Sequence, residues 1–162
     1  DAAPGGHRVA SGVLRASRAT TPYNPGDMTD SNTTLGARVP MAATIGAIVE
    51  EFGEDFARVR MPYRPDLTNS GGTFHGGALA TLLDVALCSA ARPSRAAELM
   101  VVTLDLSVHF VASSDRDVIA EARCLKRGRS IAFSQAEVRS LEGELLATAT
   151  ATLKLVPRRR PG

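Results

Sequence analysis

Residues 69–91 read NSGGTFHGGALATLLDVALCSAA. From Ala78 to Ala91 this stretch holds no proline or glycine and a single charge, and it is rich in Ala and Leu, which are good helix formers. We therefore predict a helix from Phe74 to Ala91. Its apolar residues go all the way round, which is typical of a buried helix or a membrane span. The run is shorter than the roughly 20 residues that a span needs, and Asp84 interrupts it. A buried helix covered by other elements is expected.

Two glycines, Gly76 and Gly77, stand in the opening turn of this predicted helix. Each costs roughly 0.5–1 kcal/mol relative to alanine, so their presence indicates that another group approaches the backbone closely. The first N–H groups of a helix have no internal partner and lie at the positive end of its dipole. The two glycines therefore predict a site for a carbonyl oxygen or an anion.

Asp84 is the only acid in the helix, and burying a carboxylate without a partner is costly. It is either a structural residue satisfied by a neighbour or a functional acid. Gly76 and Asp84 are eight residues apart, which is roughly 12 Å along a helix. An oxyanion donor and a base must both reach one reacting centre. If both act on one substrate, they come from two subunits whose helices lie antiparallel across a two-fold axis. This hypothesis makes a homodimer necessary for activity.

Alternating apolar and polar residues predict strands on both sides of the helix. We expect two strands before it and four after it, which is an α+β fold in which the helix covers one face of an antiparallel sheet. On the strand after the helix, Val102, Leu104, Leu106, Val108 and Phe110 share one predicted face, and Thr103, Asp105, Ser107 and His109 share the other. The predicted strands are 43–52, 56–62, 101–111, 117–125, 130–140 and 145–156.

The chain divides into three parts by composition. Residues 1–40 are rich in Gly, Pro, Ser, Thr and Arg and predict a flexible extension, with an organelle presequence as the alternative. Residues 41–157 form the predicted domain, and 158–162 a basic tail. The cysteines lie in apolar segments, as expected in a reducing, cytoplasmic compartment. With three histidines we expect no metal, with a net charge of +2 no nucleic acid, and without a membrane-spanning segment no membrane partner.

The pattern Asn69-x-x-Gly72-x-x-His75-Gly76-Gly77, followed by Asp84, resembles the signature of hotdog-fold acyl-CoA thioesterases of the phenylacetate-degradation type. The resemblance runs from about residue 41 to residue 155. It implies a curved antiparallel sheet wrapped around one long central helix, and hydrolysis of an aromatic or fatty acyl-CoA without a cofactor. It also implies a homotetramer built as a dimer of dimers.

The same resemblance implies roles for individual residues. The Gly76 N–H is the oxyanion donor and Gly77 contacts the substrate, while Asp84 is either the general base or the nucleophile. His75 orients the loop or contacts the thioester oxygen. In related enzymes a hydroxyl at the place of Thr103 works with the helix Asp on the attacking water. Asn69 is either an ordinary loop residue or, by resemblance, positions the substrate carbonyl or the water.

Lys126, Arg127 and Arg129 surround Gly128 in a predicted hairpin turn. Such turns are commonly charged because they are solvated. Three cations so close together also suit the phosphates of coenzyme A, which guanidinium groups bind in a bidentate manner.

Three other functions compete with this reading. A non-catalytic acyl-CoA-binding module has the same fold but little reason to keep Asp84. A serine esterase also uses a His-Gly-Gly loop, yet the chain has no Gly-x-Ser-x-Gly elbow. A phosphate-binding loop is disfavoured because no Gly-Lys-Ser/Thr follows the glycines.

Overall fold

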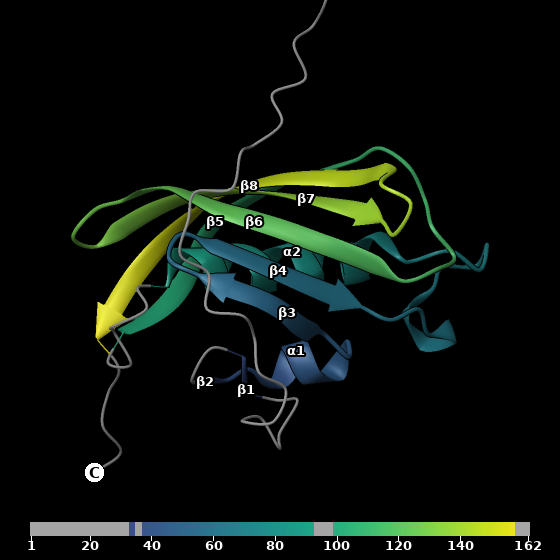
Figure 1. Cartoon of the computed structure of the whole chain (residues 1–162), viewed down its shortest axis with the longest axis horizontal. Helices are drawn as coiled ribbons and strands as arrows, with labels where there is room; N and C mark the ends of the chain where they lie inside the picture. Colours follow the sequence, from purple (N-terminus) through teal and green to yellow (C-terminus); the bar gives the residue numbers. More distant parts are fainter. Residues whose placement is uncertain (1–32, 35–36, 93–98, 158–162) are drawn as a thin grey trace, which may run out of the picture.

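The computed structural model describes residues 33–34, 37–92 and 99–157 of the 162-residue chain (Figure 1). Most of the predicted extension and all of the predicted basic tail lie outside these residues. Within the extension, the structure shows two short strands, β1 (Thr33–Thr34) and β2 (Ala37–Arg38), which pair with each other in antiparallel fashion.

Six antiparallel strands form one sheet in the order β3-β4-β6-β7-β8-β5. The sheet curves around the single long helix α2 (Figure 1), so the predicted α+β hotdog fold is confirmed. β5 lies at one edge of this sheet and β3 at the other. The strands span Ile48–Gly53 (β3), Phe56–Met61 (β4), Leu99–Phe110 (β5), Val118–Arg127 (β6), Ile131–Ser140 (β7) and Leu145–Pro157 (β8).

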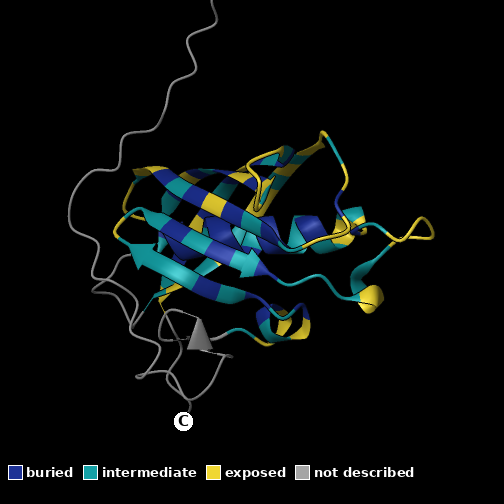
Figure 2. Ribbon diagram, turned by 45° about the vertical axis from the view of Figure 1, so that its right-hand side comes forward, coloured by how far each residue is buried: buried dark blue, intermediate teal, exposed yellow. Residues whose placement is uncertain are grey.

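The helix α2 spans Gly76–Ala91 and packs into the concave face of the sheet. Its leucines at 82, 83 and 87 are completely buried, and each such side chain contributes roughly 1.5–3 kcal/mol through burial. The strands meet them with many small residues, which allows the helix to lie close to the sheet. Figure 2 shows the resulting alternation of buried and less buried residues along β4 and β6. The buried alanines of the sheet are Ala57 on β4, Ala120 and Ala122 on β6, Ala132 and Ala136 on β7, and Ala147, Ala149 and Ala151 on β8.

One strip of α2 is not fully covered. It consists of Gly77, Thr81, Asp84 and Cys88, which follow each other at the spacing of one helix turn and remain partly or largely accessible. The expected complete cover of the helix is therefore missing along this strip in the single chain. No helix within the described residues is long and apolar enough to cross a membrane.

The first predicted strand, 43–52, is wrong in its first half. The helix α1 (Pro40–Thr44) occupies this region, and β3 starts only at Ile48. Proline at the first helical position is already in a helical φ, which favours this start. Gly46, with a φ of +68°, separates the two elements. The alternation of apolar residues that predicted a strand here therefore belongs to two different elements.

The predicted faces of the strand after the helix are wrong before its β-bulge and hold after it. A β-bulge lies between Thr103 and Asp105, so Leu104 has no partner of its own on β8. A bulge shifts the alternation of side chains by one residue. As a result Thr103 and Leu106 both face α2, while Leu104, 56% exposed, lies on the outer face.

Candidate active site

The helix α2 begins with a side-chain cap from His75. This residue has an extended backbone, and its Nδ1 accepts a hydrogen bond from the Gly77 N–H at 2.9 Å. The His75 N–H donates to the Leu67 carbonyl at 2.9 Å, which ties the cap to the preceding loop. Because Nδ1 accepts, the neutral imidazole carries its hydrogen on Nε2. The structure thus gives His75 a structural task at the start of the helix, and this explains why α2 begins two residues later than predicted.

Each of the two glycines in the opening turn lies close to an aromatic ring, which leaves little room for a side chain. A Cβ atom on Gly77 would lie 2.9 Å from His75 Nδ1, and one on Gly76 would lie 3.2 Å from the Phe110 ring. In the part of the chain that the structure describes, the Gly77 N–H is used by His75 and the Gly76 N–H has no acceptor. Gly76 therefore presents a free donor at the positive end of the helix dipole.

Asn69 closes the loop that leads into α2. Its Oδ1 accepts from the Gly71 N–H at 2.8 Å, and its Nδ2 donates to Thr73 Oγ1 at 3.0 Å. The backbone of the same residues is hydrogen-bonded as well, with Asn69 N–H donating to the Thr73 carbonyl at 2.9 Å. In the single chain, Asn69 orders the loop between itself and Thr73.

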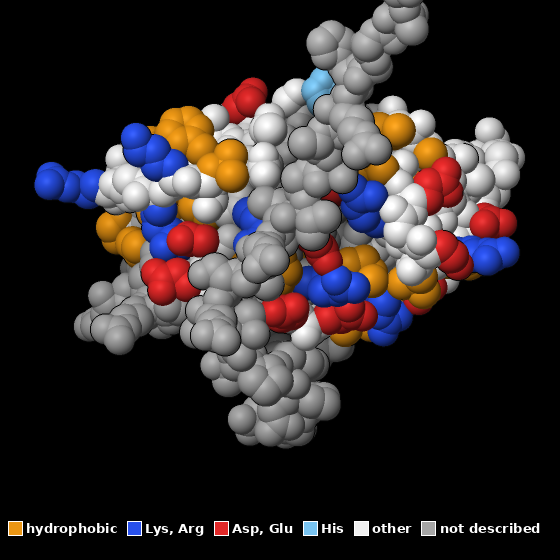
Figure 3. All heavy atoms as spheres, turned by 45° about the horizontal axis from the view of Figure 1, so that its top comes forward, with side chains coloured by type: hydrophobic (Ala, Val, Ile, Leu, Met, Phe, Trp, Pro, Cys, Tyr) orange, Lys and Arg blue, Asp and Glu red, His pale blue; other side chains and the backbone are white. Residues whose placement is uncertain are grey.

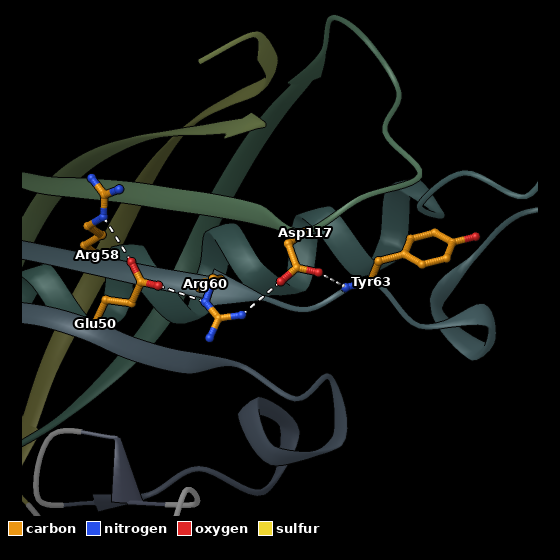
Figure 4. Close-up of polar contacts among 5 residues, drawn as sticks. All are labelled: Glu50, Arg58, Arg60, Tyr63 and Asp117. Carbon is orange, nitrogen blue, oxygen red and sulfur yellow. Dashed lines mark hydrogen bonds and ion pairs between the residues drawn. The ribbon is translucent and has the colours of Figure 1, made fainter. Parts of the chain in front are cut away.

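A chain of polar contacts that the sequence did not indicate anchors this loop to the sheet. Figure 4 shows its part from Glu50 to the Tyr63 N–H. Glu50 accepts from Arg60 Nε at 2.8 Å, and Arg60 Nη1 donates to Asp117 at 2.9 Å. Asp117 also accepts from the Tyr63 N–H at 2.9 Å, and the Tyr63 hydroxyl donates to the Gly72 carbonyl at 2.7 Å. The contacts lead from β3 through β4 and the start of β6 to the loop.

The rings of Tyr63 and Phe74 strengthen the same anchor. They meet edge to face, with centroids 5.6 Å apart and an interplanar angle of 77°. The Phe74 N–H donates to the Ser114 carbonyl at 2.9 Å. The residue directly before His75 is thereby fixed by both its ring and its backbone.

Asp84 lies on the open strip of α2 and accepts a hydrogen bond from Thr103. The Thr103 Oγ1 lies 2.6 Å from Asp84 Oδ1, which is short for a hydrogen bond and indicates a charge-assisted one. The bulge after Thr103 keeps this hydroxyl on the helix side of β5. Asp84 Oδ2 has no hydrogen-bond partner among the described residues. The carboxylate is thus held by one oxygen and open at the other.

Cys88 lies one turn after Asp84 and contacts both members of this pair. Its Sγ lies 3.3 Å from Thr103 Oγ1 and 3.9 Å from Asp84 Oδ1. Burial and the negative charge of Asp84 raise the pKa of the Cys88 thiol to about 11. The thiol is therefore protonated at neutral pH and is a poor nucleophile.

The predicted phosphate-binding turn is only partly available for that role. Arg127 is 17% exposed, and its Nε donates to the Ala91 carbonyl at 3.0 Å, at the last turn of α2. Its Nη2 also pairs with Asp55. Arg127 thus stabilises the carbonyl end of α2, where a cation is favourable. Its role as a phosphate ligand stays a prediction, since its guanidinium group already has partners in the single chain. Lys126 and Arg129 are exposed.

The tight geometry of this turn explains why a glycine occupies position 128. Its N–H donates to the Ile131 carbonyl at 2.7 Å, and a Cβ atom there would lie 3.1 Å from that oxygen.

Figure 3 shows Lys and Arg side chains interspersed with Asp and Glu on one face of the molecule.

An open hollow lies beside the start of α2. α2, the short 3-10 helix η2 (Pro65–Leu67) and Ile45, the residue after α1, line it, and its other residues include Leu67, His75, Gly77 and Thr81. The hollow reaches the open strip of α2 at Gly77 and Thr81, so a bound molecule there would lie next to the start of the helix.

Comparison with known proteins agrees with this architecture. The family model of the thioesterase superfamily matches residues 71–147, which include α2, β5, β6 and β7. Human acyl-coenzyme A thioesterase 13 is 29% identical over 97 residues, covering 59% of this chain and 69% of the human protein. The chain spans about two thirds of the length of the curated relatives that it matches.

Solved structures share the fold. A thioesterase family protein from Silicibacter pomeroyi is 31% identical, with a TM-score of 0.70, and the match covers 74% of this chain and 91% of that one. The E. coli PaaI protein from the phenylacetic acid degradation operon has a TM-score of 0.67 at 20% identity, covering 72% and 84%. The chain belongs to the thioesterase superfamily, and it is a thioester hydrolase with the hotdog fold.

Proposed function

We propose that this chain hydrolyses the thioester of an aromatic or fatty acyl-CoA to the free acid and coenzyme A. The observation that carries this proposal is the 2.6 Å hydrogen bond from Thr103 to Asp84, on the same helix whose Gly76 N–H is a free donor. A carboxylate held at one oxygen and a backbone donor are the two groups that acyl transfer to water needs. Similarity to human acyl-coenzyme A thioesterase 13 supports acyl-CoA as the substrate class.

In the proposed reaction, the Gly76 N–H polarises the thioester carbonyl and stabilises the negative charge that develops on its oxygen. Asp84 acts as general base or as nucleophile. As a base, it takes a proton through Oδ2 from a water that attacks the carbonyl carbon. The C–S bond then breaks, and the proton passes from Asp84 to the departing sulfur, which releases coenzyme A as the free thiol. Thr103 holds Oδ1 so that Oδ2 faces the water. His75 and Asn69 position the donor end of the helix, and the hollow beside Gly77 gives the substrate room.

A homodimer completes the proposed site. Gly76 and Asp84 are separated by roughly 12 Å along one helix, so a single chain does not bring both to one carbonyl. The edge strand β5 carries Thr103 next to Asp84, and it offers an unpaired edge to a second copy. Two β5 edges related by a two-fold axis would place two α2 helices antiparallel. A dimer of such dimers, in the cytoplasm, is the assembly that we propose.

Lys126 and Arg129 are the proposed contacts for the phosphates of coenzyme A. Both are exposed on the turn between β6 and β7, whereas Arg127 is occupied by α2. Within the family, the signature from Asn69 to Asp84 supports placing the chain with the phenylacetate-degradation type.

The proposed function is tested by measuring thiol release from a panel of aromatic and straight-chain acyl-CoAs with the wild type and with Asp84→Asn. The variant keeps the size of the side chain and is expected to bind substrate while losing roughly 10²–10⁴ in turnover. Asp105→Asn on the outer side of β5 is the matched control and should retain wild-type turnover. Binding without turnover in the wild type would instead favour a non-catalytic acyl-CoA-binding module.

A further inference from the structure

Cys88 takes no part in the reaction described above, yet it contacts both the Asp84 carboxylate and the Thr103 hydroxyl that holds it. Its sulfur lies 3.3 Å from Thr103 Oγ1 and 3.9 Å from Asp84 Oδ1. It lies on the same open strip of α2 as Asp84, one turn further along the helix. The three side chains form one cluster between α2 and β5.

The hydrogen atoms of this cluster can be assigned by counting donors. An ionised carboxylate only accepts, so the single hydroxyl hydrogen of Thr103 belongs to the 2.6 Å contact with Asp84. Thr103 then has only lone pairs for Cys88, and the thiol must be the donor in the 3.3 Å contact. The thiol hydrogen could also point to Asp84 Oδ1, but that contact is longer, at 3.9 Å, and gives the weaker hydrogen bond.

Other side chains on the helix show why a thiol suits this position. The hydroxyls of Thr81 and Ser89 both donate back to the carbonyl four residues earlier, at 2.9 and 2.6 Å. A hydroxyl at position 88 would have the same option at the Asp84 carbonyl. A thiol is a weaker donor and competes poorly for that carbonyl, so its hydrogen remains available to Thr103.

We propose that Cys88 is a positioning residue for thioester hydrolysis, because its S–H donates to Thr103 Oγ1 and thereby directs the Thr103 hydrogen onto Asp84 Oδ1. The chain S–H to O–H to carboxylate runs in one direction, and each hydrogen bond in such a chain strengthens the next. Asp84 is then held by Oδ1 while Oδ2 stays open to the attacking water. This inference rests on the proposed function of Asp84.

The first test is a double-mutant cycle. Cys88→Ala is expected to lower kcat about three- to tenfold with KM unchanged, the size of one modest hydrogen bond. In a Thr103→Val background the same substitution should cost less than about twofold, since Cys88 acts through the missing hydroxyl. Cys124→Ala, at the other cysteine on β6, is the control and should leave kcat unchanged. A kcat of Cys88→Ala equal to that of the wild type would overturn the proposal. So would a double variant whose fold loss in kcat equals the product of the losses in the two single variants.

The second test does not need activity. The alkylation rate of Cys88 by iodoacetamide at pH 9, followed by peptide mass spectrometry, is compared in wild type and Asp84→Asn. Removing the carboxylate charge should favour the thiolate and speed alkylation about threefold or more. Equal rates would overturn the contact between Cys88 and Asp84. Faster alkylation in a protein that hydrolyses no acyl-CoA would overturn the proposed function and leave the hydrogen-bonded cluster standing.

Discussion

The imidazole of His75 accepts the Gly77 N–H at 2.9 Å, and a Cβ atom on Gly77 would lie at the same distance from that ring nitrogen. A side chain at position 77 would therefore crowd the ring that caps α2. The cap leaves the neighbouring Gly76 N–H without an acceptor among the residues that the structure describes.

If His75 acts as a helix cap, an Asn at this position should preserve the stability of the fold, whereas an Ala should lower it. We expect His75→Ala to lower the free energy of unfolding by about 1 kcal/mol, whereas His75→Asn, a good N-cap residue, should stay close to wild type. Turnover should follow the same order. Urea unfolding and acyl-CoA hydrolysis of both variants check this expectation, and an Asn variant that is stable but inactive would show that His75 has chemistry beyond capping.

The hydroxyl of Tyr63 holds the loop through the Gly72 carbonyl. Tyr63→Phe removes this hydrogen bond and keeps the ring packed on Phe74, so we expect a loss of about 0.5–1.5 kcal/mol. Faster amide hydrogen exchange in residues 69–75 and a lower kcat should accompany it. Unchanged exchange in this loop would contradict the anchoring role.

The basic residues of the turn between β6 and β7 should have two different functions, stability for Arg127 and substrate binding for Lys126 and Arg129. Arg127→Ala removes the partner of the Ala91 carbonyl and of Asp55, so it should destabilise the fold by about 1–3 kcal/mol. Lys126→Ala with Arg129→Ala should leave stability unchanged and raise KM for acyl-CoA. Thermal unfolding and steady-state kinetics of the two proteins provide the comparison. A stable Arg127→Ala variant with raised KM would support the original prediction for that residue.

Stability at alkaline pH should depend on Cys88. Burial and the charge of Asp84 raise the pKa of its thiol from 9.0 to about 11 in the folded state. The folded chain thus binds the proton more tightly, and stability present below pH 9 is lost as the pH rises through 11. Wild type should lose up to about 2–3 kcal/mol more than Cys88→Ala over this window. Parallel stability curves of the two proteins, measured by urea unfolding from pH 8 to 11.5, would contradict this.

Local patterns in the sequence predicted the sheet, the helix and the central residues of the site. The spacing from Asn69 to Asp84 and the hydroxyl at Thr103 lie within or next to one helix, and their chemistry is visible in residue type. The face of Thr103 was predicted wrongly because the bulge at Leu104 has no local signal. The α1 helix was missed because Pro40 was placed in the extension.

Contacts between distant residues could not be predicted in this way. Arg60 and Asp117 are 57 residues apart, and Arg127 lies 36 residues after Ala91. Their pairing follows from strand order and register, and neither can be read from one sequence. The alternation of Arg58 and Arg60 showed an outward face but gave no partner for it.

The shared site is the central claim, and a mixed dimer tests it most directly. Asp84→Asn removes the acid, and Gly76→Pro removes the N–H at a position where proline suits the start of a helix. Each variant alone should be inactive. The heterodimer, isolated with two different tags, contains one intact site if Gly76 and Asp84 come from different subunits, so about half of the wild-type activity should return. An inactive heterodimer, formed from two correctly folded variants, would contradict the account.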